Sequence, residues 1–173
     1  MSGSPDTTFA PVADDQWPVV AWLWQAFQQD LAPVLDALPY ADGRYQWSRL
    51  ADAPGPDIAG YLAWRPHPNT GEQAPVGFSV VTRVAQPQRV LTAFWVAPAA
   101  RHGGLGLALA RHTVAAHPGP WAIPFQDNNV GAAAFWRRVA DEAFGPGGWT
   151  QTARLVPGKP DVPPDQWIES VTT

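Results

Sequence analysis

Apolar residues recur at helical spacing near the start of the chain, over residues 17–31. The repeat predicts a helix with one apolar face, which we interpret as core rather than as an aromatic ligand box. Asp14 or Asp15 is suited to cap this helix, and Pro18 is tolerated in its first turn. The apolar face is formed by Trp17, Val20, Trp24, Phe27 and Leu31.

Two later stretches carry the same helical pattern, at residues 105–116 and from residue 127 to about 143. The glycines of residues 145–148 end the third helix, since glycine is favoured just beyond a helix end. A further short helix is expected around residues 34–38. The buried face of the third helix is predicted to be Ala132, Ala133, Trp136, Val139 and Ala140.

Short apolar runs between the helical stretches predict β-strands. Three consecutive runs form a meander, and the last two runs form a closing antiparallel pair. Pro124 interrupts one run, so that strand is bulged or has one unpaired side. The strands are expected at residues 8–12, 58–64, 76–84, 90–96, 121–125, 149–156 and 166–171. These elements predict a single α/β (α+β) domain that spans residues 1–173.

A glycine-rich turn joins the third meander strand to the helix at residues 105–116. Pro98 ends the strand, and the residues that follow include Arg101, Gly103, Gly104 and Gly106. The first N–H groups of a helix lack partners inside the helix and favour an anion, most obviously a phosphate. Glycines allow the anion to approach the backbone, and an arginine adds a permanently charged contact. We interpret the turn as a pyrophosphate site.

Two well-known phosphate loops do not fit this turn. A P-loop needs a lysine directly after its last glycine, and the only lysine of the chain is Lys159. A Rossmann turn needs a third glycine or alanine three residues after the second glycine, and Leu109 stands there instead. The surrounding N-terminal βαβ pattern is also missing.

Composition and charge narrow the function classes further. Of the 173 residues 46% are hydrophobic and 15% charged, which is typical of a globular protein. The formal net charge of −4 and the lack of a basic run argue against nucleic-acid or acidic-membrane binding. The chain has no cysteine, which excludes a disulfide scaffold and a cysteine acyl-enzyme. Without a secretory signal or an apolar run of about 18 residues, a cytoplasmic location is expected. We expect no metal site.

Two motifs together resemble the GNAT acetyltransferase family. The first is Arg101, Gly104 and Gly106 in the spacing R-x-x-G-x-G, which is similar to the coenzyme A loop of that family. The second is Asn129 followed by Ala132 and Trp136, which resembles the family's late helix. The resemblance covers residues 76–148 well and the preceding part thinly. It implies a mixed, mostly antiparallel central sheet flanked by helices.

The resemblance also implies where acetyl-CoA would bind. The backbone of the strand before the turn would pair with the pantetheine arm, as a strand edge pairs with a peptide. The turn would hold the pyrophosphate, with His102 either touching a phosphate or facing solvent. Asn129 would contact the pantetheine segment, with a helix cap as the alternative role. Trp136 would lie near the thioester, with core packing as its alternative. The implied cofactor residues are Phe94, Trp95, Val96, Arg101, His102, Gly103, Gly104, Leu105, Gly106, Asn129 and Trp136.

Two departures from the family pattern leave the catalytic residues unassigned. Many members carry a glutamate base on the strand before the loop, but residues 89–100 contain no carboxylate. Many use a tyrosine of the late helix as an acid, and here Trp136 replaces it. Indole N–H is a donor but no practical proton source. The resemblance implies direct acetyl transfer from acetyl-CoA to a primary amine of a small molecule or peptide. The alternative is a non-catalytic acyl-CoA-binding regulatory or interaction module.

The amine acceptor is sought in the turn at residues 40–45. Tyr40, Asp42 and Tyr45 offer two aromatic rings and a charge partner for an amine, so we assign them as candidate acceptor-binding residues. The alternative is a solvated turn, since Asp42 is followed by Gly43, a strong turn signal. The identity of the acceptor is left open, and so is a homodimer.

Overall fold

A single seven-stranded sheet organises the protein. The computed structural model describes residues 6–158 and 161–171 of the chain. The strand order is β1-β2-β3-β4-β5-β7-β6, and every neighbouring pair is antiparallel except β4 and β5, which are parallel. The strands are β1 Thr8–Pro11, β2 Ile58–Pro66, β3 Gln73–Thr82, β4 Arg89–Val96, β5 Trp121–Phe125, β6 Trp149–Arg154 and β7 Asp165–Ser170. The predicted class, a mixed and mostly antiparallel sheet with flanking helices, is confirmed.

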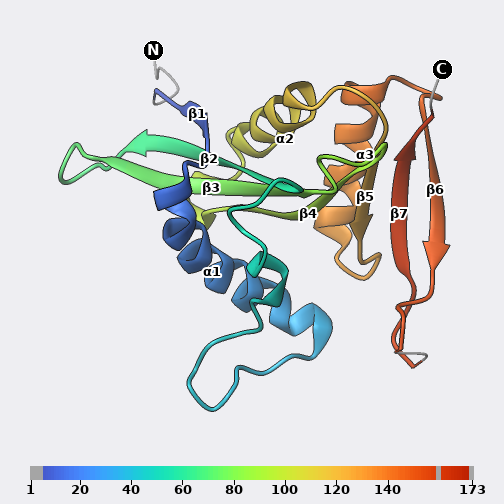
Figure 1. The fold of residues 1–173 in the computed structure, drawn as a ribbon, viewed down its shortest axis with the longest axis horizontal. Helices are drawn as coiled ribbons and strands as arrows, with labels where there is room; N and C mark the ends of the chain where they lie inside the picture. Colours follow the sequence, from blue (N-terminus) through green and yellow to red (C-terminus); the bar gives the residue numbers. More distant parts are fainter. Residues whose placement is uncertain (1–5, 159–160, 172–173) are drawn as a thin grey trace.

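In the described part of the chain, three α-helices cover the two faces of this sheet (Figure 1). α1 (Trp17–Leu35) lies on one face, whereas α2 (Leu105–Ala116) and α3 (Val130–Phe144) lie on the other. Three short 3₁₀ turns precede or follow these elements, at Asp14–Gln16, Ser48–Leu50 and Pro98–Ala100. The elements occur in the chain order that the sequence predicts, apart from the extra helix at residues 34–38.

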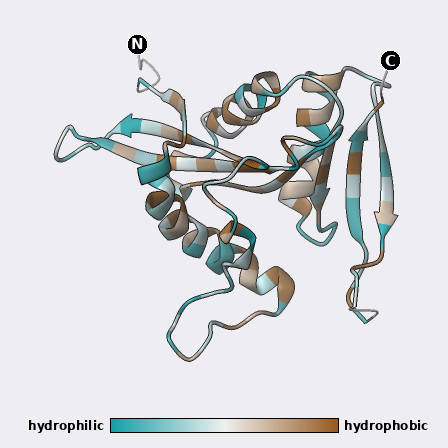
Figure 2. Ribbon diagram, in the orientation of Figure 1, coloured by the Kyte–Doolittle hydropathy of each residue, from teal (hydrophilic) through white to brown (hydrophobic). Residues whose placement is uncertain are grey.

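The core has two layers, one on each face of the sheet. On β2, the buried side chain of Leu62 joins the α1 cluster, whereas Tyr61 and Ala63 join the cluster under α2. This alternation follows from the two-residue period of a strand. Trp17, Val20 and Trp24 of the predicted α1 stripe are buried in the first layer. Figure 2 shows apolar colours in the middle of β3 and on α1, whereas β6 and β7 are mostly hydrophilic or neutral in colour.

The first helix differs from its prediction at both ends. Neither Asp14 nor Asp15 caps α1, because both lie in the preceding 3₁₀ turn and the N-cap residue is Gln16. The predicted helix at residues 34–38 is wrong, since α1 continues through Pro33 and ends at Leu35. Pro33 is exposed, so the carbonyl group left without its helical donor can be solvated.

Two predicted strands are displaced from their expected bounds. β3 begins at Gln73 rather than residue 76, and it ends at Thr82 because Arg83 adopts a positive φ of 60° that breaks the extended backbone. β6 ends at Arg154 rather than residue 156. The short hairpin between β2 and β3 is correspondingly tighter than expected.

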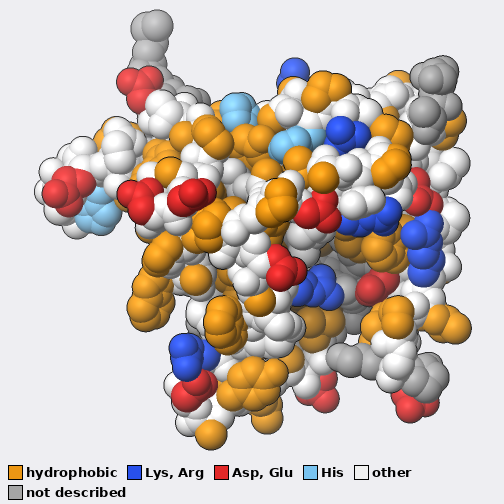
Figure 3. Space-filling model, in the orientation of Figure 1, with side chains coloured by type: hydrophobic (Ala, Val, Ile, Leu, Met, Phe, Trp, Pro, Cys, Tyr) orange, Lys and Arg blue, Asp and Glu red, His pale blue; other side chains and the backbone are white. Residues whose placement is uncertain are grey.

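The surface in Figure 3 mixes both signs of charge on the face that is shown. Hydrophobic side chains also reach the surface along α1 and the segment after it. The exposed large hydrophobic residues in this region are Trp22, Leu35, Leu38, Tyr40 and Trp47. Within the described residues, every helix is too short or too polar to cross a bilayer.

Candidate functional site

The site begins where strands β4 and β5 part. The two strands pair only through Arg89 with Trp121 and Val90 with Ala122. Beyond this point β4 stays paired with β3 up to Val96, whereas β5 pairs with β7 on its other side. The β5-facing edge of β4 after Val90 therefore has no strand partner among the described residues. Such an edge offers backbone donors and acceptors to an extended ligand.

A β-bulge lies on β4 at the same place. Val80 pairs with Ala93 and Val81 pairs with Leu91, so Thr92 is the extra residue. A bulge shifts the side-chain alternation by one position. Leu91 consequently faces the α2 and α3 layer, whereas Ala93, two residues later, faces α1. The bulge thus sets which side chains of β4 face each layer beside the opening.

The turn between β4 and α2 forms one end of the opening. His102 and Gly104 both adopt positive φ values, 66° and 81°, and Gly104 is the N-cap of α2. A Cβ atom added at Gly103 or Gly104 would meet nothing within 4 Å, so the turn presents bare backbone to open space. At Gly106 a Cβ atom would lie 3.4 Å from the Phe135 ring, which lets α2 pack closely on α3. The turn exposes the first N–H groups of α2, which attract anions.

A cavity of about 660 Å³ lies in front of this turn. Its walls come from α1, the end of β4, the turn, the start of α2 and α3. The lining residues used below are Phe27, Asp30, Arg101, His102, Asn129 and Trp136. A second cavity of about 130 Å³ adjoins it between β4 and β5. Most predicted cofactor residues therefore border the large cavity, including Phe94, Trp95, Val96, Gly104 and Gly106. Gly103 and Leu105 do not border it.

Arg101 is held by a carboxylate that the sequence did not single out. Its Nε donates to the Val96 carbonyl oxygen at 2.8 Å, and its Nη2 contacts Asp30 of α1. The same Asp30 oxygen accepts a hydrogen bond from the Trp95 indole nitrogen at 2.8 Å. Asp30 thereby joins α1, β4 and the turn. The signal that could have found it is its position three residues after Phe27 on the helical repeat.

Two more basic side chains border the large cavity. His102 lies in the turn, and Arg138 comes from α3, where its Nε pairs with Glu142 at 3.1 Å. Together with Arg101 and the positive end of the α2 dipole, they make this end of the cavity favourable for an anion. Arg138 was missed in the sequence, because only the packing of α3 against α2 brings it to the turn.

Two residues of the α3 region, Asn129 and Trp136, lie at the opening between β4 and β5. Asn129 is the N-cap of α3, and its side-chain oxygen accepts a hydrogen bond from the Ala132 N–H at 3.3 Å. Trp136 is 8% exposed, and its ring lies 5.0 Å from the Phe94 ring and 4.8 Å from the Phe135 ring. Asn129 therefore caps α3 and Trp136 packs in the core, as their alternative roles predicted. Both residues also border the two cavities, so these structural roles leave them facing a ligand.

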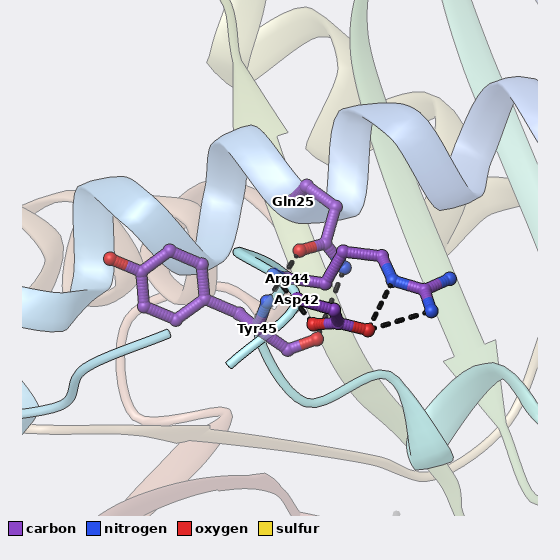
Figure 4. Close-up of polar contacts among 4 residues, drawn as sticks. All are labelled: Gln25, Asp42, Arg44 and Tyr45. Atoms are coloured by element: carbon purple, nitrogen blue, oxygen red, sulfur yellow. Dashed lines mark hydrogen bonds and ion pairs between the residues drawn. The ribbon is translucent and has the colours of Figure 1, made fainter. Parts of the chain in front are cut away.

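The turn at residues 40–45 is held together by polar contacts among Gln25, Asp42, Arg44 and Tyr45 (Figure 4). Arg44 donates to Asp42 through its backbone N–H at 3.0 Å and through its guanidinium group at 2.7 Å. These hydrogen bonds, the backbone one first, lower the pKa of Asp42. Gln25 of α1 holds the turn by accepting from the Tyr45 N–H at 2.7 Å and donating to the Tyr45 carbonyl oxygen. Tyr40, Asp42 and Tyr45 do not border either cavity. Their role in acceptor binding stays a prediction.

The polar groups of the cavities limit the chemistry that they can perform. Among the described lining residues, Asp30 alone carries a carboxylate, His102 is the one imidazole, and none is a tyrosine. Within the same described part of the chain, no cluster of three or more potential ligand residues could hold a metal ion. The arrangement can hold an anion at one end and an extended chain along β4, and it supplies few groups for proton transfer.

A separate polar pair lies outside both cavities. The Tyr61 hydroxyl and His117 Nε2 are 2.8 Å apart, where α2 ends against β2. Burial raises the pKa of Tyr61. Burial, and secondly the charge of Arg89, lower the pKa of His117. The neutral imidazole is thus favoured, and its Nε2 can accept a hydrogen bond from the Tyr61 hydroxyl.

Comparison with solved structures identifies the fold. NAA60 from Arabidopsis thaliana, in complex with a bisubstrate analogue, matches with a TM-score of 0.65 and 12% identity over 97% of this chain and 100% of that one. Its complex with acetyl-CoA matches with a TM-score of 0.62, 13% identity, and 95% and 97% coverage.

Two bacterial enzymes show the same likeness. The ribosomal-protein-S18-alanine N-acetyltransferase from Escherichia coli has a TM-score of 0.59 and 16% identity over 97% of each chain. A GNAT-family acetyltransferase from Staphylococcus aureus has a TM-score of 0.60 and 11% identity over 95% of this chain and 98% of its own. No family model and no curated protein sequence matches the chain. The chain therefore has the GNAT fold, as its two motifs predicted.

Proposed function

We propose that the protein is an N-acetyltransferase that moves an acetyl group from acetyl-CoA directly to a primary amine of a small molecule or peptide. One observation carries this proposal: β4 parts from β5 just before a bare glycine turn, and the opening leads into a cavity of about 660 Å³. A long ligand with an anionic end and an amide-containing arm suits this space. The GNAT fold, which NAA60 shows in its complex with acetyl-CoA, supports the same conclusion.

The residues of the turn fit the pyrophosphate of the cofactor. The backbone of Gly103 and Gly104 is uncovered, and the N-terminus of α2 directs unpaired N–H groups at the space beyond it. Arg138 can add charge, and the His102 ring can add a hydrogen bond. The bond from Arg101 to the Val96 carbonyl oxygen keeps the guanidinium group near the turn, and its contact with Asp30 competes with a phosphate for the same charge.

The unpaired edge of β4 fits the pantetheine arm. The backbone of residues 94–96 can pair with the amides of the arm, because β5 has already turned away. Asn129 and Trp136 border the same channel from α3. When bound, acetyl-CoA supplies a thioester whose C–S bond breaks as the new amide C–N bond forms.

The residues of this chain act mainly by positioning. An alkyl amine must lose its proton before it attacks, and the lining offers neither a tyrosine nor a glutamate for this step. Trp136 can donate a hydrogen bond, but it is no practical acid. Holding an amine against a thioester removes much of the entropic barrier by itself. We therefore propose that the amine loses its proton to water.

Glycine substitutions in the turn test the cofactor assignment. We expect Gly103→Glu and Gly104→Glu to abolish the binding of coenzyme A in calorimetry, because a carboxylate would occupy the phosphate position. Gly103→Ala is the matched control for Gly103, which lies in ordinary backbone geometry with free space around it. Gly104→Ala controls for the strain of a side chain at φ 81°. Gly104 borders the large cavity, so unchanged affinity in folded Gly104→Glu protein would overturn the assignment.

A non-catalytic acyl-CoA-binding module is the second candidate function. It is favoured by the absence of a carboxylate on β4 and by Trp136 at the position of the family's acidic tyrosine. Release of the coenzyme A thiol from acetyl-CoA, measured with a panel of primary amines, separates the two functions. Amine-dependent thiol release supports the enzyme. Tight binding of acetyl-CoA without release for any amine supports the module.

A further inference from the structure

The smaller cavity, of about 130 Å³, has an apolar character that the transfer of an acetyl group does not require. It lies between β4 and β5 beyond the point where they part. It shares part of its wall with the large cavity, including Phe94 and Trp136. The residues that border it alone are Leu91, Thr92, Ala93, Pro124, Phe125 and Gln126. The two cavities thus adjoin end to end.

Three polar side chains in this wall already have partners. The Thr92 hydroxyl bonds the Thr82 hydroxyl at 2.6 Å, and the Gln126 amide donates to Asp165 at 3.0 Å. The Asn129 side-chain oxygen caps α3. None of the described lining residues of the small cavity is charged. A space lined by uncharged side chains, most of them apolar, favours an apolar occupant over an ammonium group, and the unpaired backbone edge of β4 is left to the amides of the arm.

The path of the cofactor leads to this space. From Val96 back to Thr92 the strand advances by four residues, which is about 13 Å. The pantetheine arm contains two amides and is about as long as four extended residues, also about 13 Å. An arm that starts near the turn and follows β4 therefore ends beside Thr92, where the small cavity opens.

The volume exceeds what an acetyl group needs. An apolar protein cavity of about 150 Å³ is large enough to hold benzene, with six carbon atoms. By the same measure, 130 Å³ holds about five carbon atoms. An acetyl group has one carbon beyond the carbonyl, so it would leave most of this apolar space unfilled.

We propose that the small cavity is an acyl-chain pocket and that the protein binds short-chain acyl-CoA donors of about four or five carbons more tightly than acetyl-CoA. This inference rests on the proposed function, because it needs coenzyme A in the large cavity. Each added methylene that enters the pocket strengthens binding by up to about fourfold. Butyryl-CoA, two methylenes longer than acetyl-CoA, is thus bound up to about fifteenfold more tightly. Chains much longer than five carbons lose this gain because the pocket is full.

Calorimetry with a series of donors tests the pocket without any acceptor. The ligands are coenzyme A, acetyl-CoA, butyryl-CoA and octanoyl-CoA, and the readout is the affinity of each acyl-CoA divided by that of coenzyme A. We expect this ratio to peak at butyryl-CoA. A ratio that is flat or highest for acetyl-CoA overturns the pocket alone, and leaves the space to an apolar part of the acceptor. Failure to bind coenzyme A overturns the proposed function as well.

Two substitutions in the wall of the small cavity should move the preferred acyl-chain length in opposite directions. Ala93→Leu fills the pocket, so the peak is expected to shift to acetyl-CoA. Phe125→Leu enlarges it, so the ratio for octanoyl-CoA is expected to rise. Both residues are buried, and the dissociation constants are compared only after circular dichroism shows the native fold. Because each ratio is taken within one variant, a general loss of stability does not mimic the shift. An unchanged optimum in both folded variants overturns the proposal.

Discussion

The contact between Asp30 and Arg101 leads to our first prediction. Replacing Asp30 by asparagine, which has nearly the same size but no charge, should strengthen the binding of coenzyme A. Asp30 accepts from the Trp95 indole and pairs with Arg101, so this arginine faces the carboxylate in the absence of ligand. Asp30→Asn keeps an oxygen for the indole N–H and removes the charge that holds the guanidinium group. The bond from Arg101 to the Val96 carbonyl oxygen, at 2.8 Å, still keeps the side chain beside the turn.

The size of the effect follows from the exposure of the pair. The Arg101 and Asp30 side chains are 38% and 42% exposed, so the ion pair is weak, about 0.2–1 kcal/mol. Freeing Arg101 is therefore expected to tighten binding of coenzyme A by about 1.4- to 5-fold. Removing a negative charge from the neighbourhood of the phosphates acts in the same direction.

The assay is calorimetry with coenzyme A at two salt concentrations. The gain should be largest at about 0.1 M salt and shrink at about 1 M, where the Debye length falls from about 10 to about 3 Å. Asp127→Asn is the matched control, because it removes a carboxylate that pairs with Arg137 and does not border either cavity. In protein that already carries Arg101→Ala, Asp30→Asn can no longer free the arginine. The gain in coenzyme A affinity should then shrink to the smaller effect of removing a negative charge near the phosphates.

The result that refutes this reasoning is weaker binding in folded Asp30→Asn protein. It would mean that Asp30 holds Arg101 in the orientation that the phosphates need, rather than competing with them. Equal gains in Asp30→Asn and Asp127→Asn would refute it too, since the effect would then come from the net charge of the protein.

Three further predictions concern proton transfer, pH stability and the acceptor. With an alkyl amine acceptor, whose reference pKa is about 10.4, the rate under saturating substrates should climb with pH through neutrality, and a flat profile would reveal a tuned base. Trp136→Tyr should raise turnover by adding a proton source, whereas Trp136→Phe should impair cofactor affinity more than the chemical step. Folding lowers the pKa of His117, so at acidic pH the unfolded chain binds more protons than the folded one. The contribution of His117 to the free energy of unfolding should therefore be fully present above about pH 6.5 and be lost as the pH falls through the pKa of the folded state. Thermal melts of His117→Gln should lose part of this acid sensitivity, and an unchanged dependence would place its origin elsewhere. Asp42→Asn should raise the acceptor KM while leaving the fold intact, and an unchanged KM would remove the turn at residues 40–45 from the acceptor site.

The sequence alone determined most of the local structure. The bounds of α2 and β5 agree with their predictions, because helical spacing, glycine at position 104 and flanking prolines act over a few residues. The cap at Asn129 was likewise readable, since a capping side chain bonds an N–H three residues away. The two GNAT motifs are also local, which is why the fold could be predicted from them.

Local signals failed where neighbouring residues pointed two ways. A separate short helix was expected around residues 34–38, but the tertiary structure continues α1 through Pro33 to Leu35. Asp14 and Asp15 have good capping chemistry, yet the chain enters α1 through a 3₁₀ turn. In both cases α1 is held by its packing on β3 and β4, which outweighs a cap or a single lost hydrogen bond.

Only the tertiary structure decided how the site is assembled. The contacts of Asp30 with Trp95 and Arg101 span 65 and 71 residues of sequence, and no short-range pattern encodes such a pairing. The parting of β4 from β5 and the bulge at Thr92 depend on strand register, which is set by partners far along the chain. The sequence determined which residues can bind a phosphate, and the packing of α1 and α3 around the parted strands determined the cavity that they share.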